Sequence, residues 1–131
     1  MACAKILLAE DCDHDVMLLQ ETFRMIGGDV SFCRVSDGNR VLEACSPESG
    51  RSFELIVLDH CLPRLTASQI VGQLAAWDVL SKVPVVVLSS HLSDEEIQRL
   101  KDLGVALAAE KPSDLEELCA LARRMLALVK V

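Results

Sequence analysis

Residues 55–59 read Leu-Ile-Val-Leu-Asp, and this stretch decides the fold. Four consecutive aliphatic residues leave no polar face, which is typical of a strand buried on both sides within a parallel sheet. The aspartate that follows places a carboxylate at the end of a buried strand, where it costs free energy unless it is paired. The stretch therefore predicts a central parallel strand with Asp59 at its carboxyl end.

Four other short apolar runs accompany this one and predict a sheet of five strands. Short runs rich in Val, Ile and Leu are typical of strands. The expected strands are Lys5–Ala9, Val30–Val35, Leu55–Leu58, Pro84–Leu88 and Val105–Ala109. Ser31 and Arg34 interrupt the second run, which indicates that this strand lies at an edge of the sheet.

The segments between the strands have apolar residues at three- and four-residue spacing and predict helices. The expected helices are Asp15–Ile26, Asn39–Cys45, Leu65–Trp77, Ser93–Leu103 and Ser113–Val129. The last two begin with the Ser-x-x-Glu pattern of a capping box, and Gly104 follows the fourth as a C-terminal stop. Strands that alternate with helices through short connections predict a parallel sheet with right-handed crossovers and helices on both faces. We therefore expect one α/β domain over residues 1–131.

The charge balance excludes some classes of partner. The 131-residue chain has 20 acidic and 13 basic residues, a net charge of −7 with histidine neutral. Nucleic acid and anionic membranes are therefore not expected as direct partners, because both need a basic patch. No apolar run approaches the ~20 residues of a membrane span, and the apolar stretch at the start is too short for a secretory signal. We expect a soluble, cytoplasmic protein.

The cysteines support the same location. They are Cys3, Cys12, Cys33, Cys45, Cys61 and Cys119. No C-x-x-C pair occurs among them, which argues against a disulfide scaffold and against a structural zinc site. Free thiols in a reducing compartment are the remaining interpretation.

Polar residues follow the expected strands at their carboxyl ends, where open α/β sheets bind ligands. These residues are Glu10 and Asp11 after the first strand, Asp59 after the third, Ser89 after the fourth and Lys111 after the fifth. Three carboxylates close together repel one another and favour a hard divalent cation, and Mg²⁺ prefers oxygen ligands. With one such cation, the charges of the carboxylates and the lysine sum to zero, so that a phosphoryl group can approach.

This set of residues resembles the receiver domain of bacterial two-component response regulators, in a single-domain form like the chemotaxis regulator. The resemblance covers essentially the whole chain. It rests on Glu10-Asp11, on Asp59 with Pro63 four residues later, on Ser89 and on Lys111-Pro112. It implies a flavodoxin-like fold with strand order 2-1-3-4-5. It also implies a cis peptide between Lys111 and Pro112, which would orient the lysine toward the acids.

The function that the resemblance implies is phosphorelay signal transduction. Asp59 would accept a phosphoryl group from the phosphohistidine of a sensor histidine kinase or phosphotransfer protein. Glu10, Asp11, Asp59 and the backbone carbonyl of Cys61 would bind Mg²⁺, and Lys111 would contact the phosphoryl oxygens. Such a protein is a phosphoacceptor that assists its own phosphorylation and dephosphorylation rather than an enzyme.

The switch implied by the resemblance begins at Ser89, whose hydroxyl would move to the new phosphate and alter the surface near the fourth helix, where a downstream protein target docks. Family members carry an aromatic residue on the fifth strand that follows this movement, whereas this chain has Ala108. We therefore expect the signal to pass through the loop at Ser90–Glu96. Cys61 and His91, each two residues beyond a site residue, lie there either by coincidence or, as the resemblance implies, because they tune how water reaches the acyl phosphate.

Three alternatives belong to other classes. A phosphorylation-independent, receiver-like interaction module would have no reason to keep mutually repelling carboxylates beside Lys111. A flavin-binding protein would need a phosphate-binding loop of amides after the first strand, where Glu10 and Asp11 would repel a phosphate. A phosphatase of the haloacid-dehalogenase type needs a second aspartate two residues after the nucleophile, and Cys61 occupies that position.

Overall fold

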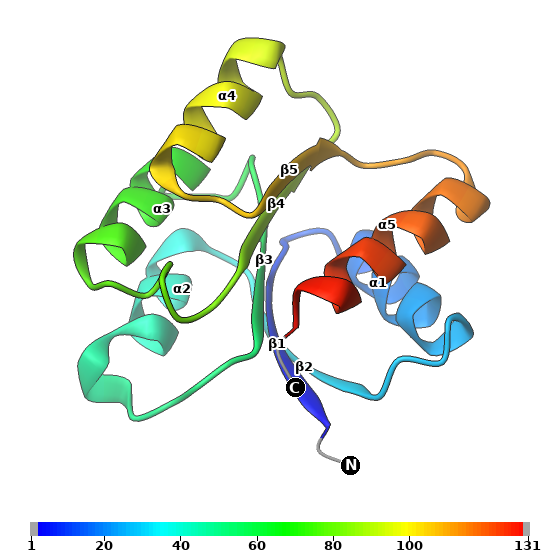
Figure 1. The fold of residues 1–131 in the computed structure, drawn as a ribbon, viewed down its shortest axis with the longest axis horizontal. Helices are drawn as coiled ribbons and strands as arrows, with labels where there is room; N and C mark the ends of the chain where they lie inside the picture. The colour runs from blue at the N-terminus through cyan, green and yellow to red at the C-terminus, as the bar shows by residue number, and fades with distance from the viewer. Residues whose placement is uncertain (1–2, 130–131) are drawn as a thin grey trace.

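The structure, a computed structural model that describes residues 3–129, contains one sheet of parallel strands. The strands are β1 (Ala4–Ala9), β2 (Val30–Val35), β3 (Leu55–Asp59), β4 (Val85–Ser89) and β5 (Leu107–Glu110). They lie in the order β2-β1-β3-β4-β5, and each neighbouring pair is parallel (Figure 1). The predicted strand order and the edge position of β2 are confirmed.

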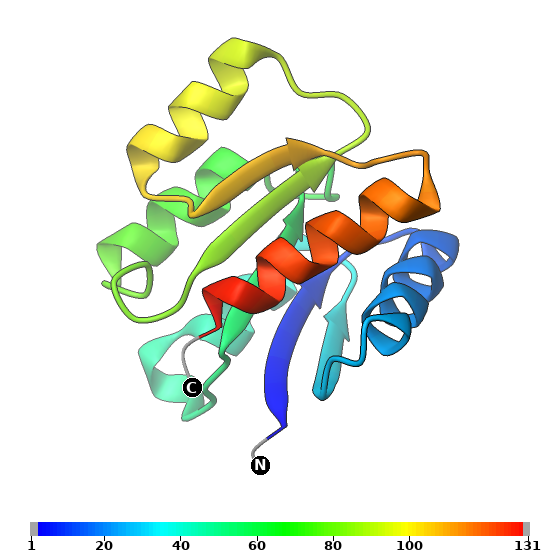
Figure 2. The ribbon, with the colours of Figure 1, turned by 45° about the vertical axis from the view of Figure 1, so that its right-hand side comes forward.

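Helices cover both faces of this sheet, as predicted. They are α1 (Asp13–Met25), α2 (Gly38–Cys45), α3 (Ala67–Ala76), α4 (Asp94–Leu103) and α5 (Leu115–Leu128), with a short 3₁₀ turn at Pro47–Ser49. Figures 1 and 2 show α1 and α5 on one face and α2, α3 and α4 on the other. No helix between residues 3 and 129 combines the length and the apolar character needed to cross a membrane.

The central strand β3 shows how the sheet separates two cores. Leu55 and Val57 pack into the core beneath α1 and α5. Ile56 and Leu58 point the other way, into the core beneath α2, α3 and α4. Successive side chains of a strand alternate between faces, so a run that is apolar on every residue must have a core on each side. All five residues of β3 are buried, including Asp59 at the carboxyl end.

The helix termini follow the capping chemistry of the sequence, with one correction. The Ser93 hydroxyl and the Glu96 carboxylate form the predicted capping box at the start of α4, and Gly104 ends that helix with a left-handed φ of 110°. The cap predicted at Ser113 is wrong: Asp114 caps α5, and its carboxylate accepts a hydrogen bond from the amide of Glu116 at 2.7 Å. A carboxylate is a stronger acceptor than a hydroxyl at the positive end of a helix.

The fifth strand lies slightly further along the chain than the apolar pattern predicts. Val105 follows the Gly104 cap of α4 and is tied to that helix, because its amide donates to the carbonyl of Leu100 at 3.1 Å. Pairing with β4 begins at Leu107 and ends at Glu110, which lies opposite Ser89. This register places Lys111 immediately beyond the end of the sheet, beside the carboxyl ends of the neighbouring strands.

Candidate functional site

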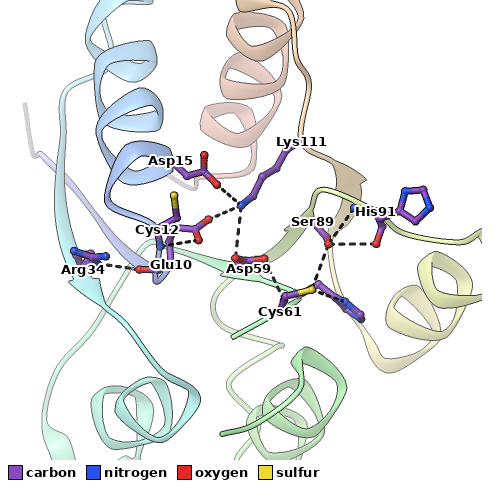
Figure 3. A network of polar contacts seen from close by, with 10 residues as sticks. Glu10, Cys12, Asp15, Arg34, Asp59, Cys61, Ser89, His91 and Lys111 are labelled. Carbon is purple, nitrogen blue, oxygen red and sulfur yellow. Dashed lines mark hydrogen bonds and ion pairs between the residues drawn. The ribbon is translucent and has the colours of Figure 1, made fainter. Parts of the chain in front are cut away.

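The carboxyl ends of four strands bring the predicted site residues together. Glu10 follows β1, Asp59 and Ser89 are the last residues of β3 and β4, and Lys111 follows β5. Backbone hydrogen bonds fix the positions of Glu10 and Lys111, the two residues that lie just beyond their strands. The Glu10 amide donates to the carbonyl of Val35 at 3.0 Å, and the Lys111 amide donates to the carbonyl of Ser89 at 2.7 Å. Figure 3 shows the side chains converging from these strand ends.

Three carboxylates form a cluster suited to a divalent cation. Oxygen atoms of Glu10, Asp11 and Asp59 all lie within 4.8 Å of one another. Glu10 and Asp59 are 5% and 8% exposed, whereas Asp11 faces solvent. A hard cation such as Mg²⁺ takes carboxylate oxygens and keeps several waters. Two buried carboxylates and a third that faces solvent fit that requirement, because the ion can keep waters on the side of Asp11.

Lys111 lies among carboxylates from three different elements. Its Nζ donates to Glu10 Oε1 at 2.6 Å and to Asp15 Oδ2 at 2.8 Å. Asp59 Oδ2 is further away, at 3.6 Å. Glu10 and Asp59 were expected beside the lysine, but Asp15, in the first turn of α1, was not identified from the sequence.

The electrostatics of the cluster follow from burial and crowding. The pKa of Glu10 is raised to about 7, because burial and then the nearby Asp59 carboxylate raise it while Lys111 partly opposes both. Burial alone would lower the pKa of Lys111, but the hydrogen bonds to Asp15 and Glu10 and the charge of Asp59 raise it above its ordinary value. The lysine therefore stays protonated. Its single positive charge faces three carboxyl groups, those of Glu10, Asp15 and Asp59.

The two carboxylate oxygens of Asp59 have different neighbours. Oδ1 accepts a hydrogen bond from the backbone amide of Cys61 at 3.1 Å, and Oδ2 faces Lys111. The amide contact keeps the backbone of Cys61 close to the carboxylate cluster (Figure 3). The assignment of the Cys61 carbonyl as a metal ligand stays a prediction.

The Ser89 hydroxyl is turned toward the loop that leads into α4. Ser89 is 1% exposed; its Oγ donates to the carbonyl of His91 at 3.2 Å and accepts from the amide of His91 at 3.3 Å. The Sγ of Cys61 lies 4.0 Å from the same hydroxyl. The carboxylate of Glu110 accepts from the amide of Leu92 at 3.4 Å. Two strand ends therefore hold this loop through hydrogen bonds.

The predicted cis peptide between Lys111 and Pro112 is wrong. No cis peptide bond occurs in residues 3–129, so this bond is trans. The trans form is the more stable one even before proline, by about 0.5–1 kcal/mol. Lys111 reaches the carboxylates without a cis bond, because its backbone is fixed beside Ser89 and its side chain extends to Glu10 and Asp15.

Arg34 is a second residue whose place in the site was not identified from the sequence. It interrupts the apolar pattern of β2 and served there only to indicate an edge strand. In the structure its Nε donates to the backbone carbonyl of Glu10 at 2.9 Å, and its Nη1 pairs with Asp13 at 2.8 Å. The guanidinium thus links the edge strand to the loop that carries Glu10 and Asp11.

An α/β sheet with this strand order has the flavodoxin-like topology, which binds ligands at the carboxyl edge where the acidic residues and the lysine lie. A family profile described as the response regulator receiver domain matches residues 6–123. The chain belongs to this family. Receiver domains are the phosphoacceptor modules of two-component signalling and bind Mg²⁺ in an acidic pocket.

Two curated relatives illustrate the range of the family. The chain is 30% identical over 118 residues to the "Probable methanogenesis regulatory protein FilR2" of Methanothrix harundinacea, a match that covers 86% of this chain and 75% of that protein. It is 31% identical over 88 residues to the "Two-component response regulator ORR3" of Oryza sativa, covering 65% of this chain and 66% of the relative. The chain spans about half of ORR1, another rice regulator.

Solved structures agree with the fold over nearly the whole chain. The phosphorylated cyanobacterial phytochrome response regulator RcpA superposes with a TM-score of 0.83 at 25% identity, covering 98% of both chains. A receiver domain from Rhodospirillum rubrum superposes with a TM-score of 0.81 at 24% identity, covering 97% of this chain and 96% of that one. The predicted flavodoxin-like receiver fold is therefore confirmed.

Proposed function

We propose that Asp59 is the phosphoacceptor of a two-component phosphorelay. The observation that carries the proposal is the position of its carboxylate, which is nearly buried at the end of β3, within 4.8 Å of two further carboxylates and 3.6 Å from the ammonium of Lys111. A nucleophile in that place meets a phosphoryl group among charges that can stabilise it.

Glu10, Asp11, Asp59 and the backbone carbonyl of Cys61 would hold Mg²⁺. The proximity of the three carboxylates indicates negative charge that a cation would neutralise. When bound, Mg²⁺ supplies positive charge beside the phosphoryl oxygens. The residues of this chain supply the rest, because such a reaction depends mostly on positioning and electrostatics.

Two further side chains complete the proposed mechanism. Lys111 is held in place by the backbone of β4 and would donate to a phosphoryl oxygen on Asp59. Ser89 would exchange its hydrogen bonds with His91 for one to the same phosphoryl group. That exchange would release the loop before α4, which supports a switch at the surface of α4 where a downstream protein docks.

The partners follow from this chemistry. A sensor histidine kinase or a phosphotransfer protein would supply the phosphoryl group, and the domain over residues 1–131 would act in the cytoplasm, where the free cysteines are stable. A phosphorylation-independent interaction module is not favoured. It would gain nothing from a buried carboxylate cluster whose members repel one another.

The experiment that tests the proposal compares the wild type with Asp59→Asn after incubation with Mg²⁺ and acetyl phosphate. Intact-mass measurement should find one added phosphoryl group in the wild type and none in the variant. Asp29→Asn is the matched control, because it makes the same charge change at an exposed position just before β2. A modified Asp59→Asn protein, or an unmodified wild type, would refute the proposal.

A further inference from the structure

The ammonium of Lys111 is not shared equally among the carboxylates around it. It donates to Glu10 at 2.6 Å and to Asp15 at 2.8 Å, whereas Asp59 at 3.6 Å is beyond ordinary hydrogen-bond distance. In the structure, therefore, the lysine hydrogen-bonds on the β1 and α1 side of the site and makes only a longer ion pair with the proposed acceptor. Figure 3 shows Asp15 reaching the lysine from the side opposite Asp59.

A lysine ammonium has three hydrogen-bond donors, and a phosphoryl oxygen on Asp59 must compete for one of them. The two existing partners differ in what they would lose. The Glu10 side chain is 6% exposed, so losing the lysine would leave a buried carboxylate oxygen without its hydrogen-bond donor. The Asp15 side chain is 34% exposed and can be solvated when it is released. The bond to Asp15 is the one that can be exchanged at the lower cost.

We propose that Asp15 is a positioning residue that draws Lys111 toward α1, beyond hydrogen-bond distance of Asp59, in the resting protein and releases it to the phosphoryl group. This inference rests on the proposed function of Asp59. Asp15 takes no part in the bond changes: the Asp59 oxygen bonds to phosphorus, the bond from phosphorus to the donor oxygen breaks, and acetate leaves acetyl phosphate with the electron pair. The effect of Asp15 is on where the lysine lies before that step.

The chain offers a matched control for the charge of Asp15. Asp13 lies in the same first turn of α1 and also carries a carboxylate near the positive end of the helix, but it pairs with Arg34 instead of Lys111. Asp13→Asn and Asp15→Asn therefore remove the same charge and the same favourable interaction with the helix terminus. Only Asp15→Asn removes a charge that holds the lysine on the α1 side of the site. Asp15→Glu keeps a carboxylate that can still reach it.

The experiment measures binding of beryllofluoride, an anionic mimic of the phosphoryl group, and the rate of phosphorylation by acetyl phosphate, both at saturating Mg²⁺. We expect Asp15→Asn to bind beryllofluoride about two- to fivefold more tightly than the wild type, the range for losing a partly exposed ion pair. The phosphorylation rate should rise by a similar factor. Asp13→Asn and Asp15→Glu should both stay close to the wild type.

A second measurement reports on the lysine itself. Nitrogen-15 spectra of the Lys111 ammonium, recorded without phosphodonor, should show slower proton exchange in the wild type and in Asp13→Asn than in Asp15→Asn. Equal exchange and equal beryllofluoride affinity in the two asparagine variants would overturn the role of Asp15 and leave Asp59 as acceptor. If the wild type binds no beryllofluoride, or Asp59→Asn binds it equally well, both proposals fall.

Discussion

The imidazole Nε2 of His60 lies 3.1 Å from the carboxylate of Glu96, across the gap between the β3–α3 loop and the first turn of α4. His60 is the residue after Asp59, and Glu96 is the acid of the α4 capping box. The loop that follows the proposed acceptor is therefore in direct contact with the start of the helix that the proposed switch would move. Glu96 takes part in both the cap and the contact.

The capping box of α4 should set the pH at which the Glu96 carboxylate becomes protonated. Hydrogen bonds from the backbone and the side chain of Ser93 lower the pKa of Glu96 below its ordinary value. A lowered pKa in the folded state means that this contribution to stability is present above the ordinary value near 4.5 and is lost as pH falls through the lowered one. We expect Ser93→Ala to raise the Glu96 titration midpoint, measured by carbon-13 spectra of its carboxyl.

The same substitution should also destabilise α4, because replacing a capping serine by alanine costs about 1 kcal/mol. Ser113→Ala is the control, since Ser113 stands beside the cap of α5 without forming it. Its effect on the free energy of unfolding should be close to zero. A Glu96 midpoint that does not respond to Ser93→Ala would show that the cap does not determine this pKa.

Divalent metal should stabilise the fold through the carboxylate cluster. At ten times its dissociation constant, a ligand that binds only the native state adds about 1.4 kcal/mol to the free energy of unfolding. We therefore expect Mg²⁺ to raise the melting temperature of the wild type. Asp59→Asn should raise the melting temperature of the metal-free protein, because it removes one of the repelling charges, and should weaken the response to Mg²⁺. A melting temperature that responds neither to Mg²⁺ nor to Asp59→Asn would contradict repulsion among these carboxylates.

Most of the fold could be predicted because its signals are local and repeated. The fully apolar run at Leu55–Leu58 requires a core on each side, and alternation with helical segments then fixes a parallel sheet. The boundaries were less accurate where two signals compete. Asp114 replaced Ser113 as a cap because its carboxylate is the stronger acceptor, and β5 began later because Val105 remains bonded to the end of α4.

The site was only partly predictable, because sequence patterns show which residues leave the strands and not which partners they choose. Strand topology predicted that Glu10, Asp59 and Lys111 lie close together, as they do, while their roles stay predictions. Asp15 and Arg34 were missed, since a helix acid and an edge-strand arginine usually face solvent and nothing in their spacing points to the site. Their roles depend on three-dimensional distances of 2.8 and 2.9 Å.

Cys45, at the C-terminal end of α2, should react more slowly than the exposed thiols near the site. Burial raises the pKa of Cys45 to about 11, with Arg51 opposing only weakly. Compared with the ordinary value of 9.0, its thiolate at pH 8 should be about 100-fold scarcer. Alkylation by iodoacetamide, followed residue by residue by mass spectrometry, should therefore be much slower at Cys45 than at the exposed Cys12. Equal rates in the native protein would contradict burial of this thiol.

Cys61 should influence the lifetime of the phosphorylated protein. Its Sγ lies 4.0 Å from the Ser89 hydroxyl at the exposed side of the site, where water must pass to reach an acyl phosphate on Asp59. We expect Cys61→Ala to open this path and shorten the lifetime, measured by loss of the phosphoryl group after the donor is removed. Cys12→Ala, on the β1–α1 loop, is the control and should leave the lifetime unchanged. Equal lifetimes in all three proteins would exclude a role for this thiol.

The last prediction concerns which segment of the protein changes conformation when Asp59 is phosphorylated. Ala108 is buried in β5, and a methyl group that moves there changes almost no buried area, so it cannot couple the site to the surface as a large side chain can. The loop before α4 is different. Ser89 bonds both backbone groups of His91, Glu110 bonds the amide of Leu92, and these bonds would be rearranged when the hydroxyl turns to a phosphoryl group.

Addition of beryllofluoride should therefore change amide chemical shifts and hydrogen exchange most at Ser90–Glu96 and least along β5. Asp59→Asn should abolish these changes, which separates them from effects of Mg²⁺ or fluoride alone. Ser89→Ala should still bind beryllofluoride at Asp59 but should lose most of the response in the loop, because the hydroxyl that links His91 to the site is gone. Changes centred on Ala108 and α5, with a quiet loop at His91, would show that the signal leaves the site by another route.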